Sequence, residues 1–232
     1  MTNDALPGNH EQAAYWEGRS GSWIESEDWT GLVTGPFGKL AMDALELRPG
    51  HAVLDVGCGT GPSTLEIARR VTPGGAVVGV DIAPSMLAPA RERAEAAGVE
   101  GVTFRAADAQ ADDLGAGAFD AVCSQFGVMF FADPVAAFAN LRRALRPGGR
   151  LAFACWQDLF VNEWMFVPGS AVVAVTGQLP PMPGPGEPGP FSLCEPGRGK
   201  NRGELHAHFV PADGRDSSGE RHGLSGSRAG QG

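Results

Sequence analysis

Short runs of mainly apolar residues alternate with helix-compatible stretches through the middle of the chain. The apolar runs lie at residues 51–56, 76–80, 102–106, 119–124 and 150–155. They are short, rich in β-forming residues and mostly apolar on both faces, which is typical of fully buried parallel strands. The helix-compatible stretches between them predict βαβ units with right-handed crossovers. The pattern therefore predicts an α/β fold with an open, doubly wound, Rossmann-like sheet that is mostly parallel.

The clearest helical stripe lies between the fourth and fifth runs. It consists of Val135, Phe138, Leu141 and Leu145. The residues 147–149 that follow, Pro-Gly-Gly, are a strong signal for the end of a helix. We expect this helix to pack the four apolar side chains against the sheet.

The remaining segments suggest a chain of four parts. Residues 1–46 predict an N-terminal helical cap, and residues 47–157 contain the predicted sheet. Residues 158–198 predict a further helix followed by a proline-rich loop. Residues 199–232 carry few large apolar side chains and many glycines, so they cannot bury enough surface to offset the entropy of ordering. We expect this last part to be a disordered tail.

Composition excludes several classes of function. The net charge is −9 and no basic cluster is present, which argues against a surface for nucleic acid or anionic membrane. No apolar run approaches the roughly 20 residues of a membrane helix, and the N-terminus has no signal-peptide pattern. The cysteines are widely spaced without a metal-ligand pattern, so we expect no metal and reduced thiols in a cytoplasmic protein. They are Cys58, Cys123, Cys155 and Cys194.

The loop after the first apolar run carries the most informative chemistry. Asp55 ends this run in the segment VLDVGCGTG, and glycines follow at positions 57, 59 and 61. Ligands of open α/β sheets bind at the carboxyl ends of the strands, where glycines let the backbone approach closely. The spacing G-x-G-x-G differs from the dinucleotide fingerprint G-x-G-x-x-G, and the lysine of a phosphate loop is absent. A carboxylate at Asp55 would repel a pyrophosphate but attract an ammonium group. The loop therefore predicts a zwitterionic ligand, and S-adenosylmethionine has such an end.

Residues 37–157 resemble the class I S-adenosylmethionine-dependent methyltransferases, in particular those similar to the ubiquinone and menaquinone biosynthesis group. The matching segments occur in the family's order and near its spacing. They are VLDVGCGTG, VVGVDIAPSML, FRAADAQADDL, FDAVCSQFGVMFFADP and LRRALRPGGRLAFACW.

The resemblance implies a set of contacts to S-adenosyl-L-methionine. Asp81 would accept hydrogen bonds from both ribose hydroxyls, a role that also suits the two oxygens of a carboxylate. The other implied contacts are Asp55, Gly57, Gly59 and Gly61 around the methionine moiety with Cys58 as a small space-filling residue, Ile82 and Met86 against the adenine, Asp108 and Ala109 at its amino edge, and Gln125 and Phe126 facing the methyl group. The aspartates could instead brace loops, cap helices or lie on the surface, and Gln125 and Phe126 could merely close a strand.

The implied reaction is in-line transfer of a methyl group from the sulfonium to a small-molecule acceptor. The donor is already activated, so the protein mainly aligns the reactants, and no catalytic residue is assigned. The segments 1–46 and 158–198 would cap the acceptor. Their aromatic and apolar side chains suit a moderately apolar molecule or ordinary helix packing, and with the flanking Trp156 they include Tyr15, Trp16, Trp23, Trp164, Met165 and Phe166. The sequence identifies neither the acceptor, nor the atom that is methylated, nor the oligomeric state.

The resemblance stops near residue 198. Members of the family continue with a helix and two antiparallel strands, one of which lies beside the fifth strand. Residues 199–232 show no such pattern, so we expect the last two strands to be missing, either through a frameshift or because the tail is naturally flexible. The fifth strand would then be an exposed edge. An inactive cofactor-binding remnant is the alternative function, and Asp55 and the glycine spacing disfavour a nicotinamide-dependent oxidoreductase.

Overall fold

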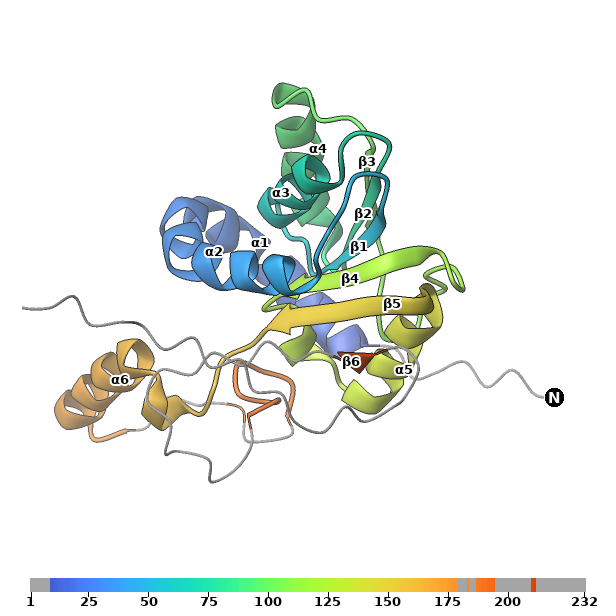
Figure 1. Cartoon of the computed structure of the whole chain (residues 1–232). Helices are drawn as coiled ribbons and strands as arrows, with labels where there is room; N and C mark the ends of the chain where they lie inside the picture. The colour runs from blue at the N-terminus through green and yellow to red at the C-terminus, as the bar shows by residue number, and fades with distance from the viewer. Residues whose placement is uncertain (1–8, 179–182, 184–186, 195–209, 212–232) are drawn as a thin grey trace, which may run out of the picture.

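A computed structural model describes residues 9–178, 183, 187–194 and 210–211. Its described strands form one sheet in the order β3-β2-β1-β4-β5-β6 (Figure 1). The pairs among β1 to β5 are parallel, which confirms the predicted doubly wound α/β fold. The strands are β1 (Ala52–Val56), β2 (Ala76–Asp81), β3 (Val102–Ala106), β4 (Phe119–Gln125), β5 (Leu145–Ala154) and β6 (Val210–Pro211).

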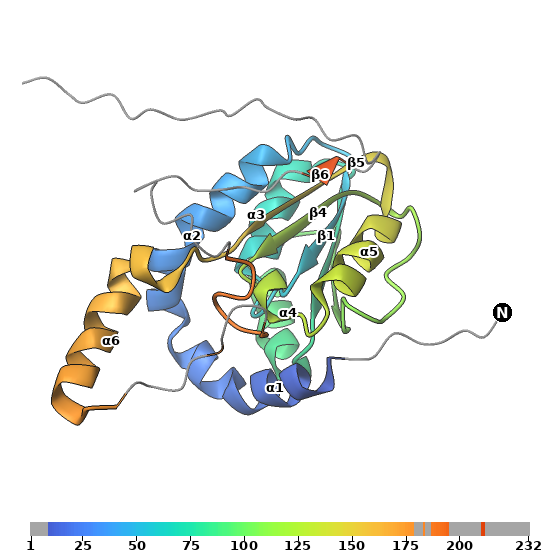
Figure 2. The same cartoon turned by 90° about the horizontal axis from the view of Figure 1, so that it is seen from below.

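Helices cover both faces of this sheet. They are α1 (His10–Glu25), α2 (Glu27–Ala44), α3 (Pro62–Val71), α4 (Leu87–Ala96), α5 (Pro134–Ala144) and α6 (Glu163–Thr176), with short 3-10 helices η1 (Pro84–Met86), η2 (Val128–Phe130) and η3 (Leu159–Val161). Figure 2 shows α2 and α3 on one side of the sheet and α5 on the other.

The central strand β1 is buried on both faces. Val53 packs with residues of α2 and α3, including Met42 and Ile67. Its neighbour Leu54 points to the opposite face and packs with residues of α5, including Leu141. Both Val53 and Leu54 are 0% exposed. Successive residues of a strand point to opposite faces, so a strand covered on both sides must be apolar at consecutive positions.

The predicted stripe on α5 is wrong in its burial for Val135 and in its element for Leu145, which is buried as expected but belongs to β5. Val135 is 82% exposed, while Leu141 is fully buried. A separation of six residues turns a helix by 600°, which places Val135 about 120° away from Leu141 around the axis. Leu145 lies beyond the last residue of the helix and is the first residue of β5. Small residues complete the buried face of α5 instead, namely Ala137 and Ala144.

The fifth strand is partly paired along its outer side. Strand β6 pairs antiparallel with β5, with Val210 opposite Leu151 and Pro211 opposite Arg150. The expectation that β5 is an exposed edge is therefore wrong at these positions. An edge strand presents backbone donors and acceptors that can pair with a segment of almost any side-chain composition. The expected disorder of the rest of 199–232, and the frameshift, concern residues outside those described.

The helix α6 lies apart from the sheet. Figures 1 and 2 both show it standing out from the body of the domain, and it has no buried residue. Its exposed apolar side chains include Trp164, Val167 and Val175. Within the ranges given above, no helix combines the length and the apolar character needed to cross a membrane.

We predict that Leu141→Ala lowers the free energy of unfolding by about 2–5 kcal/mol, because it leaves a cavity in the core between α5 and the sheet. Val135→Ala on the same helix is the matched control and should change it by less than about 0.5 kcal/mol. Chemical denaturation of both variants measures the difference. Equal effects of the two substitutions would show that α5 is rotated relative to the structure.

Candidate functional site

The carboxyl ends of β1 and β2 bring the glycine-rich loop next to Asp81. The backbone N–H of Gly59 donates a hydrogen bond of 2.8 Å to Oδ2 of Asp81. The backbone N–H groups of Gly57 and Cys58 both donate to the carbonyl of Val80. The loop after β1 is thus hydrogen-bonded to the carboxyl end of β2. This is the edge of the sheet at which the sequence predicts a ligand site.

Two of the loop glycines are required by their surroundings. Gly57 has a φ of +70°, and a Cβ at this position would lie 2.8 Å from Cα of Gly127. Gly61 has a φ of +89° and directly precedes α3. Only glycine adopts this left-handed backbone without strain, and at Gly57 only glycine fits the space. The segment is therefore shaped by backbone geometry, which leaves its N–H groups near the start of α3.

Asp55 lies beneath this loop with no solvent exposure. Its Oδ2 accepts hydrogen bonds of 2.7 Å from the hydroxyls of Ser63 and Thr64 at the start of α3. Its Oδ1 is buried and has no hydrogen-bond partner among the described residues. Burial raises the pKa of Asp55 to about 6, and it outweighs the two hydrogen bonds from hydroxyls, which lower this pKa. The carboxylate braces the loop and keeps one oxygen that lacks a donor, so the contact to the cofactor stays a prediction.

The carboxylate of Asp81 is held by the backbone on both oxygens. Besides the bond from Gly59, its Oδ1 accepts from the N–H of Ala83 at 2.9 Å. Burial raises the pKa of Asp81, although these backbone hydrogen bonds act in the opposite direction. Each carboxylate oxygen has capacity for a further hydrogen bond, so Asp81 can still accept from ligand hydroxyls. Of the two residues predicted to pack on adenine, Ile82 is half-buried and Met86 is buried in η1.

Asp108 has partners within the protein. Its Oδ2 accepts from the backbone N–H of Asn9 at 2.7 Å, and its Oδ1 accepts from the N–H of Gln110 at 2.9 Å. The adjacent Ala109 is buried, and its carbonyl accepts from the side-chain amide of Asn140. The segment is fixed by these contacts, and its predicted role at the adenine stays a prediction.

Gln125, at the end of β4, turns its side chain toward α2. Its Nε2 donates a hydrogen bond of 3.1 Å to the hydroxyl of Thr34. Its amide also fills the space that a Cβ would need at Gly38. The side chain thus lies against α2, and its predicted place beside the methyl group stays a prediction.

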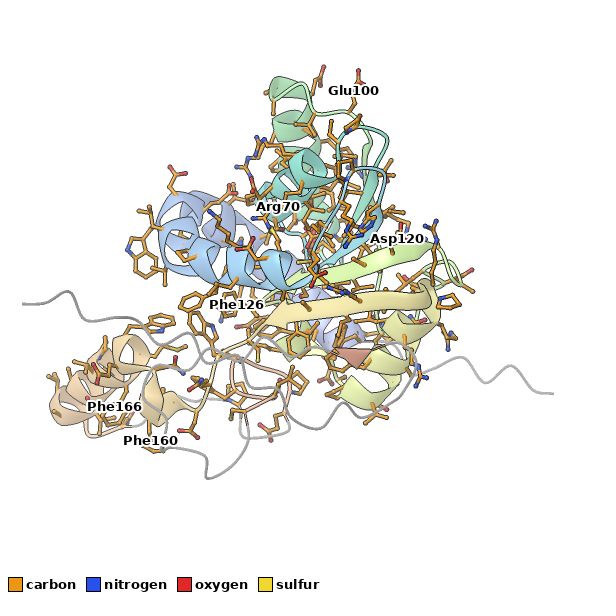
Figure 3. The ribbon with its side chains drawn as sticks, in the orientation of Figure 1. Arg70, Glu100, Asp120, Phe126, Phe160 and Phe166 are labelled. Atoms are coloured by element: carbon orange, nitrogen blue, oxygen red, sulfur yellow. The ribbon has the colours of Figure 1, made fainter. Side chains whose placement is uncertain are left out.

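Phe126 adopts a left-handed backbone conformation with a φ of +62°. Such a conformation is uncommon for a bulky residue, and strain of this kind concentrates at functional sites. Its ring stacks on Trp156, with ring centroids 4.3 Å apart. Figure 3 shows Phe126 at the end of the sheet near α2, far from Asp120 at the start of β4.

Phe126 belongs to a group of four aromatic rings from distant parts of the chain. Phe37 of α2 lies 5.9 Å from Phe126 and 5.6 Å from Trp156, and Trp164 of α6 lies 4.9 Å from Trp156. We call Phe37, Phe126, Trp156 and Trp164 the aromatic cluster. The sequence predicts Trp164 as part of an acceptor cap, but it gives no indication of Phe37, because the contact depends on where α2 crosses the sheet.

The buried cysteines are poor candidates for chemistry. Burial raises the pKa of the Cys58 thiol and of the Cys123 thiol well above its usual range. A thiol that stays protonated is neither a nucleophile nor a metal ligand. Cys58 therefore fills space in the loop, as the sequence predicts.

A parallel sheet with a fixed glycine-rich loop and an acid at the end of the next strand defines a ligand-binding domain of the doubly wound class. Comparisons with known proteins define the class further. Residues 53–149 match the family model described as a methyltransferase domain. This part of the chain is therefore similar to methyltransferase domains.

Among curated relatives, a demethylmenaquinone methyltransferase of Thermus thermophilus is 51% identical over 108 residues, which cover 47% of this chain and 48% of that protein. An aklanonic acid methyltransferase of a Streptomyces species is 37% identical over 118 residues, which cover 51% of this chain and 54% of that protein. The chain spans about half the length of these relatives.

Solved structures agree on the fold. The YcgJ protein of Bacillus subtilis matches with a TM-score of 0.50 and 26% identity, covering 60% of this chain and 58% of that one. The Haloferax volcanii protein solved with the Trm112 methyltransferase activator matches with a TM-score of 0.53 and 21% identity, covering 70% and 68%.

We predict that Asp55→Asn removes a pH dependence of stability. The folded-state pKa of Asp55 is raised to about 6. The protonated carboxyl group therefore stabilises the folded state fully at pH values below the unfolded pKa, and this stabilisation is lost as the pH rises through 6. The free energy of unfolding of the wild type should therefore fall by about 3 kcal/mol relative to Asp55→Asn between about pH 4 and pH 7. Urea denaturation of both proteins across this range measures it, and two parallel curves would contradict the buried position of Asp55.

Proposed function

We propose that the chain is an S-adenosylmethionine-dependent methyltransferase that transfers a methyl group to a small-molecule acceptor. The observation that carries this proposal is the buried Asp55, whose Oδ1 lacks a hydrogen-bond donor directly beneath the loop of residues 57–61. An anionic site below a strongly bent glycine loop favours a ligand with an ammonium group and disfavours a pyrophosphate. A methyltransferase domain over residues 53–149 supports the same assignment.

The residues present fit this cofactor. The loop of residues 57–61, with Asp55 beneath it, would hold the amino acid end. Asp81 would accept the ribose hydroxyls, since its oxygens are fixed but not saturated. Ile82, Met86 and the segment of Asp108 and Ala109 would surround the adenine. When bound, the cofactor supplies an activated methyl group on a sulfonium.

The aromatic cluster would align the acceptor and exclude water. Its rings come from α2, from the segments that follow β4 and β5, and from α6. Gly127, which follows Phe126, lies against Gly57 of the glycine-rich loop. Holding two reactants in line can contribute about 7–11 kcal/mol to catalysis without a proton transfer. The four residues of the cluster carry no titratable side chain, which suits a role in alignment and shape.

The relatives support a small-molecule acceptor, because aklanonic acid and demethylmenaquinone appear in their names. The net charge of −9 supports an acceptor other than nucleic acid. We also propose a cytoplasmic location, supported by cysteines that are all free thiols.

Titration calorimetry with S-adenosylmethionine and with NAD tests the proposal. We expect micromolar binding of S-adenosylmethionine and none of NAD. Asp81→Asn should weaken this binding about 10–100-fold, because it removes the charge that strengthens the hydrogen bonds from the ribose hydroxyls. Asp120→Asn is the control, since Asp120 also accepts a backbone N–H but lies at the opposite end of β4.

Binding of NAD instead of S-adenosylmethionine would overturn the proposal. If Asp81→Asn and Asp120→Asn weaken the binding of S-adenosylmethionine equally, the assignment of Asp81 is wrong. Release of S-adenosylhomocysteine in the presence of apolar aromatic acceptors then measures turnover.

A further inference from the structure

The N-terminal helices contact the glycine-rich loop through one polar network. Its centre is Thr60, which lies between Gly59 and Gly61 and is 2% exposed. The hydroxyl of Thr60 donates a hydrogen bond of 2.5 Å to Oε1 of Glu27 in α2. The carbonyl of Thr60 accepts a hydrogen bond of 2.6 Å from Nη1 of Arg93 in α4. Both the side chain and the backbone of this loop residue are therefore held.

Glu27 and Arg93 also pair with each other at two points. The distances are 2.5 Å from Nη1 to Oε1 and 2.7 Å from Nη2 to Oε2. Burial acts to raise the pKa of Glu27, but the hydrogen bonds from Arg93 and Thr60 outweigh it and hold that pKa below its usual value. A two-point pair between guanidinium and carboxylate is the strongest and most directional type of ion pair. We call Glu27, Thr60 and Arg93 the Thr60 latch.

The latch connects three parts of the molecule that pack on different supports. Glu27 belongs to α2, which packs against β4 and β5, and Arg93 belongs to α4, which packs against β3 and η1. Thr60 belongs to the loop after β1. Figure 2 shows α1 and α2 passing the end of the sheet near α4. The latch joins these three parts through the ion pair of Glu27 with Arg93 and through the hydroxyl and carbonyl of Thr60.

Helix α1 and the residue before it also contact the other segments proposed to hold the cofactor. Glu17 accepts hydrogen bonds from the backbone N–H and the hydroxyl of Ser85, at 3.3 and 3.0 Å, in η1 directly after the loop of Asp81. The backbone N–H of Asn9 donates to Asp108. The indole Nε1 of Trp23 lies 3.9 Å from the place of a Cβ at Gly59. The N-terminal helices thus touch each proposed cofactor segment.

We propose that Glu27 and Arg93 are positioning residues, which hold the peptide around Thr60 in the conformation that receives S-adenosylmethionine and keep α1 and α2 over it. The inference rests on the proposed function. Gly59 on one side of Thr60 is hydrogen-bonded to Asp81, and Gly61 on the other side directly precedes α3. A shift of Thr60 would therefore move both glycines, which are proposed contacts of the cofactor.

The experiment compares Glu27→Gln and Arg93→Lys with Glu46→Gln. Glutamine keeps the size of glutamate without the charge, and lysine keeps the charge of arginine without the planar guanidinium group that forms a two-point pair. Glu46→Gln is the control, because it removes a more exposed ion pair, Glu46 with Arg150 at 2.9 Å, which involves no residue of the loop. Calorimetry gives the Kd for S-adenosylmethionine, and thermal unfolding gives the Tm of each protein without ligand.

We expect each latch variant to raise the Kd about tenfold while it remains folded, whereas Glu46→Gln leaves the Kd unchanged. The double variant should raise the Kd less than the product of the single effects, because all the contacts belong to one network. The KM for S-adenosylmethionine should rise with little change in kcat at saturating cofactor, since the reacting groups are untouched.

Latch variants that bind as tightly as Glu46→Gln would overturn the inference. A wild type that does not bind S-adenosylmethionine would overturn the proposed function instead. If circular dichroism shows that Glu27→Gln or Arg93→Lys is unfolded, Thr60→Val is tested instead, because it removes only the hydrogen bond from Thr60 to Glu27. Raised Kd in folded Thr60→Val supports the latch, and unchanged Kd overturns it.

Discussion

The burial of one carboxylate at the end of the central strand constrains the whole ligand-binding edge. Asp55 has no contact with solvent, and its position follows from β1 being flanked by β2 and β4. A buried carboxyl group needs hydrogen-bond donors, and the hydroxyls of Ser63 and Thr64 provide them for one oxygen. This requirement fixes the first turn of α3 over the strand and forces the intervening chain into the tight glycine-rich loop.

The other parts of the site are arranged around that loop. Gly59 links it to Asp81 and so to β2, while Thr60 links it to α2 and α4. On the far side, Gly57 lies against Gly127, which directly follows Phe126 of the aromatic cluster. The proposed cofactor and acceptor regions therefore share one rigid segment of backbone. Such an arrangement suits a reaction in which alignment contributes more than acid–base chemistry.

The sequence was sufficient for features that depend on local pattern. The apolar runs predicted β1 to β5, and β1 is buried on both faces as expected, as Val53 and Leu54 illustrate. Burial on both faces was wrong for β3, the edge strand, which is exposed at Thr103, Arg105 and Ala106. The glycines at 57, 59 and 61 predicted the bent loop, since all three have positive φ. The resemblance carried by five ordered motifs agrees with the match of residues 53–149 to a family model of methyltransferase domains.

Features that depend on contacts between distant segments could not be predicted. Val135 was placed on the core face because its spacing looked regular, whereas the small side chains of Ala137 and Ala144 make the actual contact. The pairing of β6 with β5 involves backbone groups and leaves no trace in side-chain pattern. Likewise, nothing local to Glu27 indicates that it meets Arg93, and nothing local to Gln125 indicates that it lies against α2.

A crystal structure of the chain with bound S-adenosylhomocysteine would test the account most directly. The account predicts that the amino acid end lies on the loop of residues 57–61, that the ribose hydroxyls donate to Asp81, and that the sulfur faces Phe126. A ligand bound elsewhere, for example in the cavity of about 270 Å³ lined by Arg48, Asp120 and Arg146 at the opposite end of the sheet, would contradict it.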